Sequence, residues 1–424
     1  SCLVGSEMCI RDRIKEEIGD RECSRLQLGA RIPKDQTEAE DHLRKRFGAG
    51  GSAPLKSSLV EEVARQLSDL GDGQNLVIDK PEILALIDVL TLTVELDIRS
   101  HYFYGRYRKL ERGIPQTKWP CRACKGRGCE KCDQTGLQYK SSVQGLIGDP
   151  LLEMFGSQEH AFHGMGREDI DVRCLGRGRP FVMEMKKPIK RNIDAEVILE
   201  AINSSANGSI EVSDIRPSNR SEVVRVKDTP AEKSYTIRYK IEAITESEFD
   251  TLTQVMEVPA NNQDRNKRRK NHHRRKKPEP EPEPEAEMDY SSMKKAELVE
   301  LCLEKGLAKS GTKDVLIERL SSFKEATLPL PEADYVMEIM TNLQGCTLAQ
   351  RTPERVAHRR ADKIRKRKVL ETSKPSIEVD ADGNMVAEFS LRCESGTYVK
   401  ETVHGDSGRT QPSIASLILS LIHI

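Results

Sequence analysis

Hydrophobic and polar residues along this chain follow both a helical and a strand-like period. Leu59–Leu70 has the apolar spacing of an amphipathic helix, and helices are also predicted over 143–155 and 193–203. Thr93–Ile98 alternates with period two, which is typical of a half-buried strand. Further strands are predicted at 75–79, 83–88, 180–185, 233–241 and 385–392. The sequence therefore predicts helices and strands mixed along the chain.

An abrupt change of composition at Asn261 divides the pattern. Lys267–Lys277 is a basic block, and the alternating Pro-Glu run of Pro278–Glu285 that follows is expected to be an extended, semi-rigid spacer. After it, Met293–Leu307 predicts a helix that ends at Gly306, and the segment 310–313 caps a second helix over 314–320. We expect this helical hairpin to be an insertion.

Length and composition narrow the class of protein. The chain has 424 residues, enough for two or three domains, and its 68 basic residues balance 68 acidic ones. Any affinity for nucleic acid must then come from local clusters of charge. No apolar run reaches about 18 residues, which argues against a membrane span. Because no secretory signal is visible either, a cytoplasmic location without membrane contact is expected.

Four of the 11 cysteines form two closely spaced pairs. Cys121 and Cys124 make one C-x-x-C motif, and Cys129 and Cys132 make the next. Two such motifs supply four thiolates for a tetrahedral zinc ion, and glycines between them permit the tight turns. No open ligand position is implied. We therefore expect a structural zinc site, with no organic cofactor.

The segment Arg99–Arg112 interleaves aromatic and basic side chains, among them Tyr102, Phe103, Tyr107 and Lys109. Rings can stack on exposed bases while cations meet phosphates, which suits RNA. An amphipathic strand whose tyrosines close a small core explains the same residues. The composition does not separate these two interpretations.

The stretch with the most chemical content is Phe162–Arg173, which is followed by the glycine-rich Leu175–Pro180. Glycines on both sides allow sharp turns and a close approach to a ligand, and the charges between them need partners if they are buried. The pattern suits a loop that presents a carboxylate. A surface turn with ordinary salt bridges is the alternative.

Within that stretch, Gly166-Arg-Glu-Asp169 resembles the catalytic Gly-Arg-x-Asp loop of pseudouridine synthases. The longer run through 183–187 resembles the archaeal tRNA pseudouridine synthases named for T-loop positions 54 and 55. Two further motifs follow in the family order: Lys233-Ser-Tyr235 and Ser395–Lys400. The resemblance implies that Asp169 is the nucleophile, that Tyr235 stacks on the uracil, and that Lys400 pairs with the aspartate.

The same resemblance implies an α+β fold. It consists of a catalytic domain with a mixed or antiparallel sheet, an N-terminal α/β region like a THUMP domain, a zinc knuckle and an inserted hairpin resembling a SAP motif. The expected boundaries are 14–118 for the THUMP-like region, 119–137 for the knuckle, 138–260 and 326–418 for the catalytic domain, 261–290 for a disordered linker, and 291–325 for the hairpin.

Seven arginines are expected to contact RNA. Arg106 and Arg108 belong to the aromatic and basic segment, and Arg167 precedes the implied nucleophile. The others come from 350–368, where nine of 19 residues are Arg or Lys: Arg351, Arg355, Arg359 and Arg360. The expected partner is tRNA, with further nucleic-acid contact through the hairpin. A non-catalytic RNA-binding zinc protein and a SAP-type DNA-associated protein are the alternatives.

Both ends of the chain depart from the family pattern. Residues 1–13 and 419–424 resemble foreign sequence attached to a truncated chain, since family members continue past Ile418. We expect these two segments to lie outside the fold.

Overall fold

The computed structural model describes residues 2–48, 50–68, 75–257, 290, 293–304, 306–322, 327–358, 360–373 and 375–422. The chain divides into two compact units, Ser1–Thr229 and Pro230–Ile424. Most of the expected linker 261–290, including the basic block and the Pro-Glu run, lies outside the described residues, as does Arg359.

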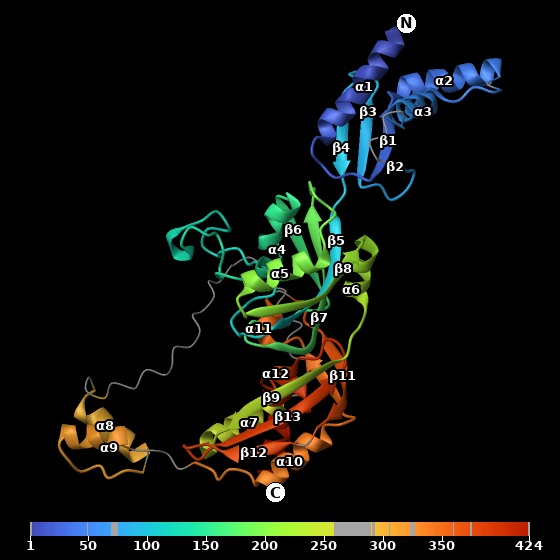
Figure 1. Cartoon of the computed structure of the whole chain (residues 1–424). Coiled ribbons are helices and arrows are strands. Elements are labelled where there is room, and N and C mark those ends of the chain that lie inside the picture. Colours follow the sequence, from blue (N-terminus) through green and yellow to red (C-terminus); the bar gives the residue numbers. More distant parts are fainter. Residues whose placement is uncertain are drawn as a thin grey trace. The chain divides into compact units, whose positions relative to one another are not determined.

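The N-terminal part of the first unit is a mixed sheet with helices packed against it (Figure 1). Its strands lie in the order β2 (Asn75–Leu76), β1 (Arg25–Arg31), β3 (Ile83–Asp88), β4 (Val94–Ile98). β1 runs parallel to both neighbours, and β4 is antiparallel to β3. α1 (Cys2–Ile18) and α3 (Leu55–Ser68) contribute core residues, whereas none of the side chains of α2 (Lys34–Phe47) is buried.

The second sheet of this unit is antiparallel and has helices on both faces. Its order is β6 (Glu159–Gly164), β7 (Cys174–Lys186), β5 (His101–Lys109), β8 (Ile210–Ser218). α4 (Val143–Phe155) and α5 (Ala195–Ala206) pack on the face that carries Phe103 and Phe181, whereas α6 (Arg220–Asp228) packs with Val182 of the opposite face. The aromatic and basic segment, expected in the THUMP-like region, is therefore a central strand of this second sheet.

Local sequence explains the bounds of α4. The hydroxyl of Ser142 accepts a hydrogen bond from the backbone N–H of Gly145 at 3.0 Å, which caps the first turn. Gly156 ends the helix in the left-handed region, at φ +59°. These two signals lie in the sequence, and the predicted range 143–155 is confirmed.

A third sheet is the centre of the second unit. β13 (Met385–Cys393) pairs along its length with β9 (Lys233–Ile241), and its other edge is shared by β12 (Ser376–Val379) and β11 (Ile364–Thr372). β10 (Thr347–Arg351) and β14 (Thr410–Gln411) extend the sheet beyond β11. α10 (Ala333–Asn342) and α13 (Ile414–Ile422) pack on it, and the remaining helices are α7 (Glu246–Glu257), α11 (Glu354–Ala357) and α12 (Val399–His404).

The inserted hairpin has a core of its own. α8 (Lys295–Glu304) and α9 (Lys313–Ser322) lie side by side in Figure 1. Leu298, Cys302, Leu316 and Leu320 are buried between them. The predicted pair of helices is confirmed, with each helix shifted by one or two residues from the expected ends.

Two segments assigned to foreign sequence are part of the fold, contrary to expectation. Ile10, within the excluded residues 1–13, is 1% exposed and packs in the same core as Ile14 and Leu26. At the other end α13 runs to Ile422, and Leu419 is 8% exposed. Among the described residues, no helix has the length and apolar content needed to cross a bilayer.

Candidate functional site

The loop that carries Asp169 connects β6 to β7 in the first unit. Gly166 begins its sharp turn at φ +74°, and the Asp169 side chain is half-buried. Asp169 itself accepts a backbone hydrogen bond from Val172 N at 3.3 Å, which closes a short turn after the aspartate. Asp169 therefore lies in a loop whose backbone is constrained, and its role as a presented carboxylate stays a prediction.

A buried lysine donates hydrogen bonds to the backbone of this loop. Lys109, at the end of β5, is 0% exposed. Its Nζ donates to the backbone oxygens of Ile114 at 2.9 Å, Asp169 at 3.0 Å and Ile170 at 3.0 Å. Burial lowers the pKa of Lys109, and the negative charge of Glu168 opposes that change. Two of the three carbonyl acceptors thus belong to the loop itself.

Glu168 lies beside Asp169 in sequence, but its carboxylate points into the protein. It is 8% exposed and accepts hydrogen bonds from the Tyr107 hydroxyl at 2.8 Å and from Gln116 Nε2 at 3.1 Å. Arg179 Nε lies 2.9 Å from the same carboxylate. Burial, followed by the charge of Glu168, raises the pKa of Tyr107 well above the usual tyrosine value. The phenol therefore stays protonated at neutral pH and donates to Glu168.

Other carbonyls of the loop are also held by side chains. Arg179 Nη1 donates to Met165 O at 2.6 Å, and Gln116 Nε2 donates to Gly166 O at 3.0 Å. Arg112 Nη1 donates to Asp171 O at 2.6 Å. Together with the two bonds from Lys109, these contacts hold the backbone carbonyls of five of the seven residues from 165 to 171. The bonds from charged donors are the stronger ones.

Arg167 is exposed, and it is directed to the segment before the cysteine cluster. Its guanidinium carbon lies 5.1 Å from the ring centre of Trp119, within the range of a cation–π interaction. Trp119 in turn meets Tyr139 edge-on, at 5.6 Å between ring centres. Arg167, next to the implied nucleophile, thus contacts the start of the segment 119–137, here called the cysteine module.

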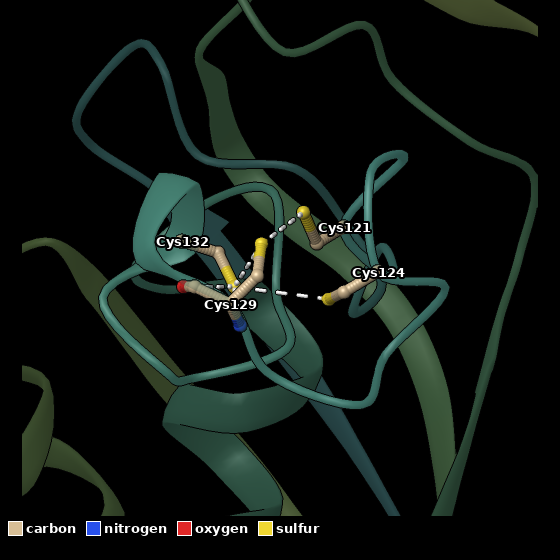
Figure 2. Close-up of side chains that lie close together, drawn as sticks. All are labelled: Cys121, Cys124, Cys129 and Cys132. Carbon is tan, nitrogen blue, oxygen red and sulfur yellow. Dashed lines mark hydrogen bonds between the residues drawn. The ribbon is translucent and has the colours of Figure 1, made fainter.

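The four cysteines predicted as metal ligands come together, and their sulfur atoms all lie within 4.8 Å of one another (Figure 2). The separations are 3.9 Å for Cys121–Cys129, 3.9 Å for Cys124–Cys132 and 3.6 Å for Cys129–Cys132. A tetrahedron with metal–sulfur bonds of about 2.3 Å places its sulfurs about 3.8 Å apart. The cluster therefore has the spacing of a four-thiolate metal site.

The turns of this module depend on glycine. Gly136 has φ +71°, and a Cβ atom built on it would lie 2.4 Å from Gly126 O. Gly136 O also accepts from the backbone N–H of Cys121 at 2.7 Å. A side chain at 136 would push apart the two segments that carry the cysteine pairs.

In the second unit, Tyr235 and Lys400 come from different elements. Tyr235 lies on β9 opposite Leu391 and is half-buried against the sheet core. Lys400 is half-buried in the first turn of α12. The buried Gln350 holds the start of that helix, since it accepts from Tyr398 N at 2.8 Å and donates to Tyr398 O at 2.9 Å. The pairing of Lys400 with Asp169 stays a prediction.

The arginines expected to bind RNA make contacts within their own units. Arg106 donates to Arg177 O at 2.6 Å and Gly178 O at 2.8 Å, and Arg108 pairs with Glu211. In the second unit, Arg351 pairs with Asp362 at 2.6 Å, Arg355 pairs with the buried Glu401 at 2.6 Å, and the exposed Arg360 donates to the Tyr398 hydroxyl at 3.4 Å. RNA contact by these residues stays a prediction.

For three residues of the aromatic and basic segment, the core interpretation holds. Phe103 and Tyr107 are 1% and 0% exposed, and Lys109 is buried with them, so none of the three can meet an RNA base or phosphate. Sequence reasoning missed Lys109, Glu168 and Gln116 as parts of the site. A signal existed for Lys109, because period-two alternation places it on the same strand face as Phe103 and Tyr107.

Comparison with known proteins covers nearly the whole chain. The family described as "Pus10, C-terminal" matches residues 102–282 and 326–424, "Pus10 THUMP domain, archaeal" matches 10–88, and "SAP domain" matches 289–324. The C-terminal match begins at residue 102, in agreement with the place of β5 in the second sheet. The THUMP match begins at residue 10 and the C-terminal match extends to residue 424, so the matches include part of residues 1–13 and all of 419–424.

Relatives named tRNA pseudouridine synthase Pus10 match most of this chain. The protein of Methanothrix thermoacetophila is 34% identical over 97% of this chain and 70% of its own length. Those of Methanopyrus kandleri and Methanothermobacter marburgensis are 33% and 32% identical, over 95% and 96% of this chain and 72% and 78% of their lengths. The expected α+β fold, with its THUMP, SAP and catalytic parts, is confirmed. The chain belongs to the Pus10 family.

Proposed function

We propose that this chain is a tRNA pseudouridine synthase that isomerises uridine in the T-loop, at position 54, position 55 or both, with Asp169 as the nucleophile. The family and the name of its relatives support the reaction class. The observation that carries the role of Asp169 is its position between two residues whose groups are held inside the protein: the Glu168 carboxylate and the Ile170 carbonyl.

The reaction exchanges one bond of the nucleoside for another. The N1–C1′ bond breaks, the uracil turns, and a C5–C1′ bond forms; C5 loses a proton and N1 gains one, so the product is an isomer. Covalent capture by a carboxylate divides this exchange into easier steps. In this proposal Tyr235 stacks on the uracil and Lys400 pairs with Asp169 and orients it.

A uridine inside a folded tRNA must leave its stack before Asp169 can reach it. Flipping a nucleotide costs a few kcal/mol, which stacking and phosphate contacts offset. In this proposal Arg167, which is exposed beside the nucleophile, fills the space that the base leaves. Arg106, Arg108, Arg351, Arg355, Arg359 and Arg360 are the proposed contacts to RNA phosphates, and the hairpin supplies a further nucleic-acid contact.

We assign the four-cysteine cluster to a structural zinc ion. All four ligand positions are thiolates from one short segment, and the sulfur spacing suits a closed tetrahedral site. The ion would fix the fold of 119–137 and take no part in the bond exchange. Among the described residues, the cysteines of this cluster form no disulfide, which suits a reducing compartment.

The test uses the purified full chain with T-loop transcripts, and pseudouridine is mapped at single-nucleotide resolution. Wild type should convert one or both T-loop uridines, while Asp169→Asn, of nearly the same shape, should bind RNA with turnover below about one hundredth of wild type. Turnover above that level would move the nucleophile elsewhere, with Asp171 as the next candidate. RNA binding without any isomerisation by wild type would favour a non-catalytic RNA-binding protein, and a preference for DNA would favour the SAP-type alternative.

A further inference from the structure

The buried ammonium of Lys109 has one carbonyl acceptor for each of its hydrogens. An ammonium has three hydrogens, and three carbonyl oxygens accept from it at 2.9–3.0 Å: those of Ile114, Asp169 and Ile170. A planar guanidinium could not address three such acceptors around one point. Burying a charged lysine is unfavourable, so a position that keeps one in full burial is a candidate for function.

Glu168, the residue before Asp169, is also held inside the protein. Its carboxylate is fixed by Tyr107 of β5, by Gln116 and by Arg179 of β7. The residue before Asp169 is therefore held by its side chain, and the residue after it is held by its carbonyl. With both neighbours fixed, the backbone at Asp169 is held on both sides.

We propose that Lys109 and Glu168 are positioning residues, which act on the reaction by holding the backbone of Asp169 where its carboxylate meets the flipped uridine. This inference rests on the proposed role of Asp169 as nucleophile. Neither residue touches the substrate. A displacement of about 1 Å at a reacting group can cost about 100-fold in rate, so loss of either constraint acts on the chemical step.

The alternative is that the two residues serve folding alone. A buried charge network stabilises or destabilises the whole unit without regard to the loop, in which case its removal changes the melting temperature and the fraction of folded enzyme. The rate constant of the chemical step, measured per folded molecule, would then stay unchanged. This difference separates the two roles.

The experiment measures the single-turnover rate constant of isomerisation at saturating T-loop transcript, and separately the RNA dissociation constant. The variants are Lys109→Met, Lys109→Arg and Glu168→Gln. Lys186→Met is the control, because Lys186 is exposed at the far end of the same β7 and pairs only with Glu159 at 2.7 Å among the contacts described. Circular dichroism and thermal unfolding establish the folded fraction of each.

We expect each of the three variants to lower the single-turnover rate constant by about 100-fold, with the dissociation constant within about threefold of wild type. Lys109→Arg should not restore the rate, since it keeps the charge but not the three-way geometry. Lys186→Met should behave as wild type. Folded Lys109→Met and Glu168→Gln enzymes with rate constants within about threefold of wild type would overturn the proposal.

Two further outcomes are decisive. If Lys109→Met does not fold, Glu168→Gln decides, because glutamine keeps the size of the side chain and can still accept from Tyr107; if neither folds, the role is structural and the proposal fails. Failure of the proposed function looks different: an active Asp169→Asn enzyme rejects Asp169 as nucleophile. An inactive Asp169→Asn beside normal Lys109 and Glu168 variants rejects only the positioning role.

Discussion

The guanidinium carbon of Arg167 lies 5.1 Å from the ring centre of Trp119, two residues before the first cysteine of the metal cluster. The segment around Trp119 is closed by backbone hydrogen bonds, from Gln138 N to Trp119 O at 2.8 Å and from Cys121 N to Gly136 O at 2.7 Å. These two bonds hold the backbone that carries the ring contacted by Arg167. An exposed cation–π contact of this kind is worth about 0.5–1 kcal/mol, small enough to exchange for RNA contacts.

The first prediction uses Trp119 as a reporter, because it is the one tryptophan of the chain. If Arg167 leaves the ring to fill the place of the flipped base, adding T-loop RNA should change the intrinsic fluorescence. In Arg167→Met the change should fall to less than about one third of the wild-type amplitude, since the cation is already gone. Arg122→Met, in the exposed part of the cysteine module, is the control. An RNA-induced change of equal size in both variants would contradict the exchange.

The second prediction concerns the cysteine cluster. Freshly purified protein should contain one zinc ion per chain by elemental analysis, and Cys124→Ser should lose it. A structural ion supplies local folding free energy, so RNA should bind this variant about tenfold more weakly than wild type. The rate at saturating RNA should stay within about threefold of the wild-type rate. Cys346→Ser, outside the cluster, should keep its zinc. Wild-type protein without stoichiometric zinc would reject the assignment.

The third prediction concerns pH and the buried Glu222 of α6. Hydrogen bonds from Arg216, with further ones from Ser218 and Arg225, lower the pKa of Glu222 to about 2 from the ordinary 4.5. Because the folded pKa lies below the unfolded one, its contribution to stability is complete above about pH 4.5 and is lost as pH falls through about 2.

Glu222→Gln should therefore lower the free energy of unfolding at neutral pH by about 1–3 kcal/mol and flatten its dependence on pH between those two values. The change in the free energy of unfolding stays modest because both arginines are at least half exposed and water screens their charges. Denaturant unfolding at several pH values measures it. The exposed Glu196→Gln should match wild type, and a Glu222 variant with an unchanged acid slope would contradict the linkage.

The fourth prediction is that residues 262–325 act as an affinity module. The hairpin buries its own small core, and the Pro-Glu composition of the preceding segment favours an extended spacer that keeps it near bound RNA. Deleting 262–325 should weaken RNA binding most at low salt, where counterion release favours basic contacts, and leave turnover at saturating RNA nearly unchanged. Loss of turnover at saturating RNA would place the insert in the active architecture.

Much of the secondary structure was determined by the sequence alone. The predicted ranges 143–155 and 233–241 match α4 and β9, because a capping serine, a terminal glycine and period-two alternation are local signals. The four-cysteine cluster and the order of the three motifs were also readable from the sequence. By contrast, β1 was missed, although Leu26, Leu28 and Ala30 give Arg25–Arg31 a period-two alternation. Its parallel partners lie about 50 residues further along the chain, and only the tertiary structure brings them together.

Only the tertiary structure decided which charges serve the site from inside. In the sequence, Lys109 is one more cation in a segment whose composition suits RNA binding. Glu168 is the unspecified third residue of the Gly-Arg-x-Asp motif. Alternation along β5 determines that Lys109 shares a face with Phe103 and Tyr107, but packing of α4 and α5 determines that this face is covered. The acceptors of Lys109 come from a loop some 60 residues away. Long-range packing of this kind has no counterpart in local sequence patterns, because burial and hydrogen-bond partners are set by the whole fold.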